Sequence, residues 1–319
     1  MNDSSNFHEG ERAVQLRAGE AFIAERNGAM VASTVVRGAR PFIESQFMVV
    51  VGSIDGHGRL WASVLYGRPG FARSSDGSTV RIDAPRGYRD MEDPLWGALR
   101  AGVQLGLLFI DLGTRRRYRV NGVLRDVDEG GFEVAVLEAF PNCPKYIQRR
   151  QLRALDEAPR RAQSASGTVL AGSVAAIVQQ ADTLFVASRH PSAGLDVSHR
   201  GGDRGFARIV DAATLHIPDY AGNSLFNTLG NFAVDSHAAI AIPDFENGRL
   251  LQLTGTATLR WNDEGLDDDT GGTGRSWDFR IRHWVLRDAM QRATWDYIDA
   301  SPYNPHPRNE PSQLPRSTT

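Results

Sequence analysis

The sequence predicts a mainly β protein built from two similar small antiparallel barrels with a few helices. Two stretches read almost the same, GFARSSDGSTVRID beginning one residue before Phe71 and GFARIVDAATLHIPD beginning one residue before Phe206. These phenylalanines are 135 positions apart, and Asp111 and Asp244, in two later matching segments, are 133 apart. A nearly constant offset indicates a duplication. About six short, closely spaced strands per copy favour barrels over a parallel α/β sheet.

The composition excludes several classes of protein. With 319 residues and 41% hydrophobic residues, the chain is long enough for two cores. A net charge of −2 does not supply the positive field that nucleic-acid binding needs. The single cysteine, Cys143, excludes an internal disulfide, and the polar N-terminus and short apolar runs do not resemble a signal peptide or a membrane span. We therefore expect a cytoplasmic protein with no nucleic-acid or membrane partner.

The first copy begins with two strands around a polar turn, over residues 46–67. A helix is predicted over residues 93–102, where apolar residues recur on one helical face. Residues 105–124 read as a hairpin, because Tyr118 and Val120 alternate with polar residues along its second strand.

The middle of the chain is predicted to be helical. PKYIQRRQLRALDEAP reads as a helix that begins at Pro144, where the missing N–H of proline costs nothing. A Ser/Gly/Ala-rich joint near 160–168 separates it from a second helix, GSVAAIVQQAD, over residues 172–182.

The second copy repeats the order of the first. Two strands over 182–202 precede a strand, a loop and a helix over 214–234. A hairpin over 238–259 and a closing strand over 276–286 complete the copy. The proline-rich tail from Ser301 is expected on the surface or disordered.

Several of these segments resemble a known family. GLDVSHRGG, HIPDYAGNSLFNTLGN and AIAIPDFENGRLLQLTG are similar to segments of the pyridoxamine 5′-phosphate oxidase-like FMN-binding split barrels. RPFIESQF, GRPGFAR and NCPKYIQRR resemble the larger bacterial members that carry two barrels in one chain. The resemblance implies two tandem split β-barrels that form an intrachain pseudo-dimer, with FMN in the cleft between them. The implied organisation is an N-terminal helix and first barrel over 1–142, a helical linker over 143–180, a second barrel over 181–290 and a surface tail over 291–319.

The loop PDYAGNSLFN is a candidate phosphate site. A glycine-containing loop that enters a helix presents free N–H groups at the positive end of the helix dipole. Tyr220, Asn223 and Ser224 are the predicted cofactor residues of this loop. The family's loop often carries Ser-Arg-Lys, and no cation stands here. The alternative is an ordinary helix N-terminus capped by Gly222 or Asn223.

Two strands supply the other predicted cofactor residues. Ser198, His199 and Arg200 lie on the strand that, by resemblance, follows the flavin and ends in a cationic phosphate ligand. Arg117 and Asn121 could face the cleft from the first barrel. The alternative is that both groups are solvated polar residues of strand ends and surfaces.

The resemblance implies an FMN-binding oxidoreductase that acts on a small-molecule redox substrate and that could form a homodimer. No side chain stands out as an acid or base, so no catalytic residue is assigned. We find no Arg-x-His substrate motif, which argues against a phosphorylated vitamin as substrate. The alternative function is a non-catalytic carrier or sensor of flavin, deazaflavin or haem, with His199 or His216 as the axial ligand of a haem. A third possibility is a structural relic with an empty cleft. His8 and Glu9 lack a third ligand nearby in sequence, so no metal site is predicted, and Cys143 is expected to be an idle thiol.

Overall fold

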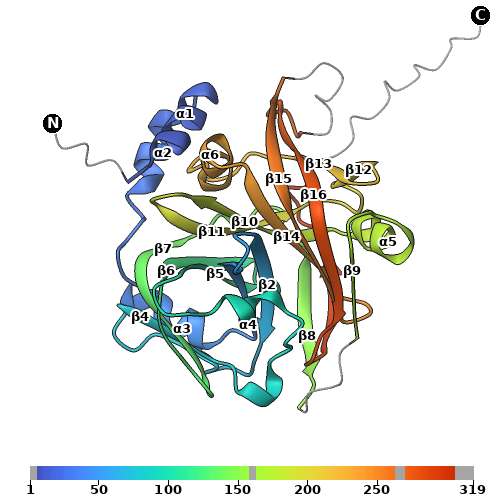
Figure 1. Cartoon of the computed structure of the whole chain (residues 1–319). Helices are drawn as coiled ribbons and strands as arrows, with labels where there is room; N and C mark the ends of the chain where they lie inside the picture. Colours follow the sequence, from blue (N-terminus) through green and yellow to red (C-terminus); the bar gives the residue numbers. More distant parts are fainter. Residues whose placement is uncertain (1–5, 158–162, 263–269, 306–319) are drawn as a thin grey trace, which may run out of the picture.

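The computed structural model describes residues 6–157, 163–262 and 270–305. Strands dominate these residues, and antiparallel pairing joins them (Figure 1). The prediction of a mainly β chain is therefore confirmed. Among the described residues, no helix is long and apolar enough to cross a membrane.

The first half of the chain forms a seven-stranded sheet in the order β2-β1-β5-β6-β7-β4-β3. Alternating or wholly apolar residues on these strands place one face in a core. The strands are β1 (Met48–Ile54), β2 (Leu60–Tyr66), β3 (Ala72–Arg73), β4 (Thr79–Asp83), β5 (Gln104–Asp111), β6 (Arg116–Asp128) and β7 (Gly131–Pro141).

The second half forms another seven-stranded path, in the order β11-β10-β14-β15-β16-β13-β12. When its strands are counted from its own start, this order is identical to that of the first sheet, so the duplication read from the sequence is present in the fold. The strands are β10 (Thr183–His190), β11 (Gly194–Gly201), β12 (Arg208–Asp211), β13 (Thr214–Pro218), β14 (His237–Asp244), β15 (Arg249–Trp261) and β16 (Arg275–Asp288), and β9 (Ser164–Gly167) pairs with β16. Among the described residues no strand pairing closes either sheet into a barrel, so the two-barrel arrangement stays a prediction.

Short helices cover the ends of the sheets. Helices α1 and α2 lie beside α6 (Figure 1). The α1–α6 crossing is close, because a Cβ built on Gly10 would lie 2.2 Å from the carbonyl oxygen of Gly230. The helices are α1 (Glu9–Arg17), α2 (Ala21–Gly28), η1 (Arg37–Ala39), α3 (Arg40–Glu44), η2 (Arg86–Tyr88), α4 (Pro94–Ala98), α5 (Gly172–Gln180) and α6 (Asn227–Val234).

The helix predicted from Pro144 is wrong. Residues 149–155 form strand β8 (Arg149–Leu155), which pairs with β17 (Ala293–Asp299) in a two-stranded sheet. The helix-forming arginines, glutamines and leucines of this segment are overridden by pairing with a strand about 140 positions away. The helix predicted over 172–182 is confirmed as α5.

The first residues of the tail, which we expected on the surface or disordered, are packed against the rest of the chain. Ser301 and Asn304 are buried, and the backbone N–H of Ser301 donates to Oε1 of Gln148 at 2.8 Å. The amide of Asn304 donates to the same oxygen at 3.2 Å. This part of the tail is therefore anchored, while residues 306–319 lie outside the described residues.

Three apolar clusters form the interior. One lies within each sheet, and the third joins the two halves. We call the contact between β1, β2 and β5 of the first half and β10, β11 and β14 of the second half the seam. Gly52 and Gly106 pair with each other there, and a Cβ on Gly106 would lie 2.9 Å from the carbonyl oxygen of Leu195. Glycine at these positions therefore lets β11 approach the first sheet closely.

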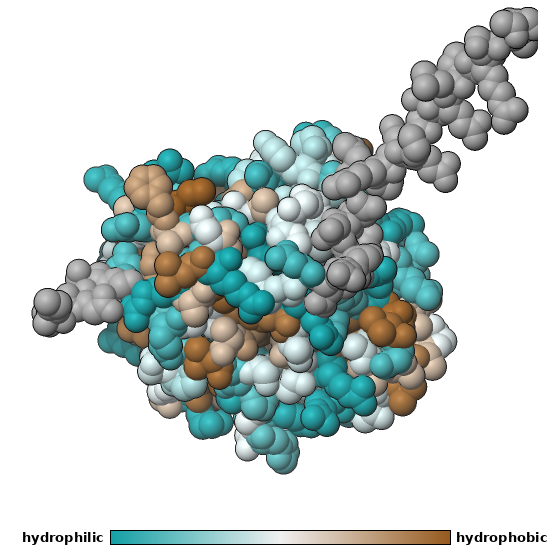
Figure 2. Space-filling view, turned by 90° about the horizontal axis from the view of Figure 1, so that it is seen from above, coloured by the Kyte–Doolittle hydropathy of each residue, from teal (hydrophilic) through white to brown (hydrophobic). Residues whose placement is uncertain are grey.

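The outer surface mixes polar and apolar residues. Figure 2 shows separate brown patches within a mainly teal and white face. Leu16 and Phe22 of α1 and α2 are among the most exposed large apolar side chains, at 71% and 79%. The buried apolar residues, in contrast, lie in the two sheets and the seam.

Candidate functional site

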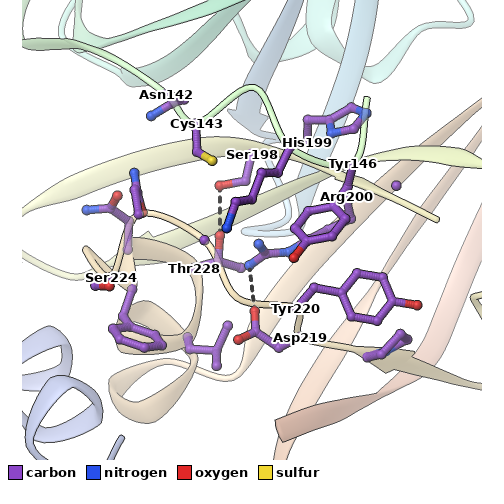
Figure 3. A pocket seen from close by; sticks show the side chains of 18 of the residues that line it. Asn142, Cys143, Tyr146, Ser198, His199, Arg200, Asp219, Tyr220, Ser224 and Thr228 are labelled. Carbon is purple, nitrogen blue, oxygen red and sulfur yellow. Dashed lines mark hydrogen bonds and ion pairs between the residues drawn. The ribbon is translucent and has the colours of Figure 1, made fainter. Parts of the chain in front are cut away.

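A cavity of about 80 Å³ lies where the two halves meet, and we call it the Arg200 pocket. The first half contributes β6 and residues 142–146, and the second half contributes the end of β11, the loop after β13 and the start of α6 (Figure 3). Seven of the eight predicted cofactor residues line it, namely Arg117, Ser198, His199, Arg200, Tyr220, Asn223 and Ser224.

Asn121, the eighth predicted cofactor residue, does not line this pocket. It lies on the same strand as Arg117 and Arg119, but its amide donates to the carboxylate of Asp196 at 2.8 Å and to that of Glu138 at 3.2 Å. The side chain is buried behind Arg119, where these acceptors hold it. Period-two alternation places Asn121 on the same face of β6 as Arg117 and Arg119. It does not show how far along the strand the pocket extends.

Helix α6 begins directly at the pocket. Phe226 precedes it in a left-handed conformation, with φ of 61°, and no side chain caps the helix. The Gly222 or Asn223 cap considered from the sequence is therefore absent. The first N–H groups of an uncapped helix attract anions, and residues 227–229 of the first turn line the pocket.

The side chains of the loop have protein partners already. Ser224 Oγ donates to Glu20 Oε2 at 2.6 Å, and Asn223 Oδ1 accepts from the backbone N–H of Leu225 at 3.2 Å. The Tyr220 ring packs against that of Tyr146 with centroids 5.0 Å apart (Figure 3). The loop therefore offers shape and backbone N–H groups more than free hydroxyl groups.

The backbone is strained around the pocket. Tyr146, Ser224 and Phe226 all have positive φ, of 65°, 63° and 61°. Such conformations are rare for residues other than glycine and cost free energy that the surrounding structure must offset. Three of them line this one pocket.

The pocket carries an excess of positive charge. Among the described residues, the basic ones that line it are Arg117, Arg119, Lys145, Arg200 and Arg275, and the one carboxylate is Asp219. That carboxylate is shared, because it lies 3.4 Å from Arg200 and accepts from Arg275 Nε at 3.1 Å. Asp196 and Glu20, outside the lining, pair with Arg119 and Arg275. The remaining lining cations supply positive charge that a bound anion would balance.

Buried donor atoms of two of these arginines have no partner among the described residues. These atoms are Nε of Arg119 and Nε of Arg200. Burial lowers the pKa of Arg200, and the Asp219 carboxylate offsets part of this effect. Burial also lowers the pKa of Arg117 to about 10, which leaves it protonated at neutral pH. Unpaired buried donors are costly, and the charge of these two side chains favours an anion beside them.

His199 is a neutral part of the wall. Its ring meets the edge of Phe185 with centroids 5.8 Å apart, and neither ring nitrogen has a partner among the described residues. Burial, followed by the charges of Arg117 and Arg200, lowers its pKa well below the usual value. His216, the other candidate haem ligand, does not line the pocket, and its Nδ1 lies 2.8 Å from Asp278.

The sequence reasoning missed several residues of the pocket. Arg119 was signalled by its place between Arg117 and Asn121, and its guanidinium binds Asp196 at 2.9 Å and the Ser198 hydroxyl. Arg275 follows an acidic loop and gave no local signal. The missed lining residues with polar side chains are Arg119, Asn142, Cys143, Lys145, Tyr146, Asp219, Asn227, Thr228 and Arg275.

A network of carboxylates lies behind the arginines. Asp196 accepts hydrogen bonds from Arg119, Asn121 and Asn231. Burial, together with the Asp196 carboxylate, raises the pKa of Glu11 to about 8. At neutral pH Glu11 therefore holds a proton.

We expect this carboxyl group to make the fold less stable in alkali. The folded-state pKa of Glu11 lies above its usual value of 4.5, so the folded chain binds more protons than the unfolded chain between these values. Stability should fall as the pH rises from about 4.5 to about 8. Urea titrations at pH 5 and pH 9 should show that Glu11→Gln reduces this fall by about 4 kcal/mol. The exposed Glu25→Gln is the control, and an equal fall in both variants would contradict the assignment.

His8, Glu9 and His190 form a group whose ligand atoms lie within 4.8 Å of one another. His8 caps α1, because its Nδ1 accepts from the backbone N–H groups of residues 10 and 11. Nδ1 of His190 likewise accepts from the backbone N–H of Ala193 at 3.0 Å. In the neutral rings the proton is therefore on Nε2, which lies 3.0 Å from Asn231 Oδ1 in His8 and 3.0 Å from Glu9 in His190. This arrangement favours a hydrogen-bonded contact over a metal site.

Comparison with known proteins gives distant matches. No protein-family model and no curated protein matches the sequence. Among solved structures, HupZ of Group A Streptococcus is 14% identical, with a TM-score of 0.28, over 34% of this chain and 85% of its own. A candidate pyridoxamine 5′-phosphate oxidase from Lactobacillus delbrueckii is 11% identical, with a TM-score of 0.31, over 37% of this chain and 94% of its own. A Clostridium acetobutylicum protein of the pyridoxinephosphate oxidase family, related to general stress protein 26 of B. subtilis, is 9% identical, with a TM-score of 0.29, over 40% and 92%.

Proposed function

We propose that this chain binds FMN at the Arg200 pocket and works as a flavin-dependent oxidoreductase on a small-molecule substrate. The observation that carries the proposal is the surplus of positively charged side chains around the start of α6. The resemblance of GLDVSHRGG and HIPDYAGNSLFNTLGN to FMN-binding split barrels supplies the identity of the phosphorylated ligand. In this proposal each seven-stranded sheet corresponds to one split barrel.

The phosphate group is the part of FMN that the pocket fits. A cavity of about 80 Å³ has room for roughly six water molecules, which suits a phosphate group and not a three-ring system. Arg200 would hold the phosphate through the positive charge of its guanidinium, and Arg275 and the first turn of α6 would add positive charge. Only the phosphate end would enter this cavity, and the ring would lie outside it.

The chain supplies binding and electrostatics in this proposal. Bound FMN would supply hydride and electron transfer. Arg117, whose guanidinium donates to the backbone carbonyls of Cys143 and His199, would keep a fixed positive charge near the ligand. His199 would stay neutral and take no proton at pH 7, because its pKa lies well below the usual value.

A non-catalytic flavin carrier is the second candidate. One observation favours it: Asp219, the one carboxylate among the described lining residues, is tied to two arginines. No described carboxylate of the pocket is therefore free to act as an acid or base. Anaerobic reduction of the flavin-loaded protein by NADH or NADPH, followed at 450 nm, separates the two, since a carrier would not be reduced.

We expect purified apo-protein to bind FMN with micromolar affinity and riboflavin at least tenfold more weakly, because the pocket binds the phosphate. Quenching of flavin fluorescence measures both affinities. Arg200→Ala removes one charge-assisted contact, which is worth about 1.5–3 kcal/mol, so FMN affinity should fall about tenfold to a hundredfold. Riboflavin affinity should change little.

Arg280→Ala is the matched control, because Arg280 is exposed on β16 and does not line the pocket. It should bind FMN like the unchanged chain. Equal affinities for FMN and riboflavin, or an unchanged FMN affinity in Arg200→Ala, would remove the phosphate role from this pocket.

A further inference from the structure

A second cavity lies on the opposite part of the seam, and we call it the Arg287 pocket. Its volume is about 370 Å³, within the range of small-molecule sites. The first half contributes the ends of β2 and β4 and residues 88–96, and the second half contributes Arg287 and residues 289–291. None of the residues predicted to bind a cofactor lines it.

This pocket is the internal counterpart of the Arg200 pocket. Strand β2 takes the place of β11, and β4 takes the place of β13, because the two strand orders are identical. The hydrogen bonds agree with this correspondence. Arg119 donates to Ser198 Oγ, and Gln252 donates to Ser63 Oγ at 3.0 Å. Both pairs follow the sequence offsets of 133 and 135 positions.

Three of the five cations described in the Arg200 pocket have no charged equivalent in its counterpart. Positions equivalent to Arg117, Arg119 and Arg200 carry Leu250, Gln252 and Leu65. The hydroxyl of Thr228, which bonds Ser198, is replaced by the carboxylate of Asp93, which accepts from Ser63 at 2.5 Å. The groups that favour phosphate in one pocket are therefore apolar, uncharged or acidic in the other.

Two of the described arginines line this pocket, Arg68 and Arg287, and both have carboxylate partners. Arg68 is exposed and pairs with Glu157 at 2.5 Å. Arg287 donates to Asp90 at 2.8 Å, to Gln252 Oε1 at 2.8 Å and to Asp93. Both aspartates are buried, at 7% and 1% exposure. Among the described residues, Arg287 is the one buried guanidinium beside these two carboxylates, and the Arg68 charge is paired with Glu157. The buried group therefore keeps a negative charge in a region of low dielectric, where it acts strongly on a ligand.

Aromatic side chains form the walls above these charges. Tyr66, Phe71, Tyr88 and Trp96 all line the cavity. Burial raises the pKa of Tyr66 to about 12, so its phenol is uncharged at neutral pH. Aromatic faces attract cations and stack with flat rings.

We propose that the Arg287 pocket binds a planar organic cation, an aromatic ring that carries a protonated amine, and excludes phosphorylated ligands. The proposal does not rest on flavin binding at the Arg200 pocket. It requires only the negative charge beside Asp90 and Asp93 and the aromatic walls.

Two acridines of the same ring system test the proposal on the full chain. 9-Aminoacridine is a planar cation, and acridine-9-carboxylate is an anion. We expect one equivalent of 9-aminoacridine to bind with micromolar affinity and the carboxylate to bind at least tenfold more weakly, measured by fluorescence titration. Arg200→Ala and saturating inorganic phosphate should leave the affinity for 9-aminoacridine unchanged, because they act on the other pocket.

Two variants locate the ligand. Asp90→Asn removes the uncompensated charge and should weaken binding of 9-aminoacridine about tenfold, and Tyr88→Leu removes an aromatic face and should weaken it about threefold. The controls are Glu129→Gln and Phe22→Leu, which make the same kinds of change at exposed sites and should have no effect. Since Tyr88 is partly exposed, its variant is informative even if Asp90→Asn does not fold. Equal affinity for the two acridines, displacement of the cation by phosphate, or unchanged binding in Tyr88→Leu would overturn the proposal.

Discussion

Replacing Arg287 with methionine is expected to lower the free energy of unfolding by about 3–5 kcal/mol. The guanidinium is buried at 5% exposure and is the cation that faces both Asp90 and Asp93. Removing it leaves two carboxylates buried without their counter-charge, and a single unpaired buried charge already has a cost of this size. Urea unfolding followed by circular dichroism measures the effect.

The control is Arg282→Met, on the same strand, where the side chain is exposed. It should change stability by less than about 0.5 kcal/mol. Combining Arg287→Met with Asp90→Asn and Asp93→Asn should recover part of the loss, because all three charges are then absent. A loss below about 1 kcal/mol in Arg287→Met alone would show that the carboxylates do not depend on this arginine.

Replacing Gly106 with valine is expected to destabilise the chain by about 3 kcal/mol. A Cβ at this position would lie 2.9 Å from the carbonyl oxygen of Leu195 and 3.2 Å from the carbonyl carbon of Asp196. Both atoms belong to backbone, which cannot move aside as a flexible side chain can, so β11 would be pushed from the first sheet. Thermal unfolding and urea titration measure the loss.

Gly106→Ala should fall between the unchanged chain and Gly106→Val, because it adds one carbon atom instead of three. Gly56→Val is the control, since a Cβ at Gly56 meets nothing within 4 Å. If Gly56→Val and Gly106→Val were equally stable, the close approach at the seam would not limit the residue at position 106.

The hairpins of both sheets could be predicted because apolar and polar residues alternate along their strands. No such alternation shows that the segment after Pro144 is a strand and not a helix. The hairpins over 105–124 and 238–259 carry their pattern within about twenty residues, and they appear as β5–β6 and β14–β15. Strand β8 has no such pattern. It is a strand because β17 pairs with it, and that partner lies about 140 residues further along the chain.

The candidate site divides in the same way. Ser198, His199 and Arg200 are consecutive, so a single motif placed them together. Arg275 reaches the pocket through Asp219 and Glu20, which lie on distant segments. The position of Arg275 in the pocket depends on contacts between three distant segments, and no short sequence pattern predicts such contacts.

Strand β8 follows the first sheet in the chain and β17 follows the second, and the two strands pair with each other. Arg115, in the β5–β6 turn, strengthens this pairing by donating to the backbone carbonyl of Ile147 at 2.8 Å and to Asp299. A pocket made by two separate chains empties when a dimer dissociates on dilution. Here the two walls belong to one molecule, so ligand affinity should be the same at nanomolar and at millimolar protein.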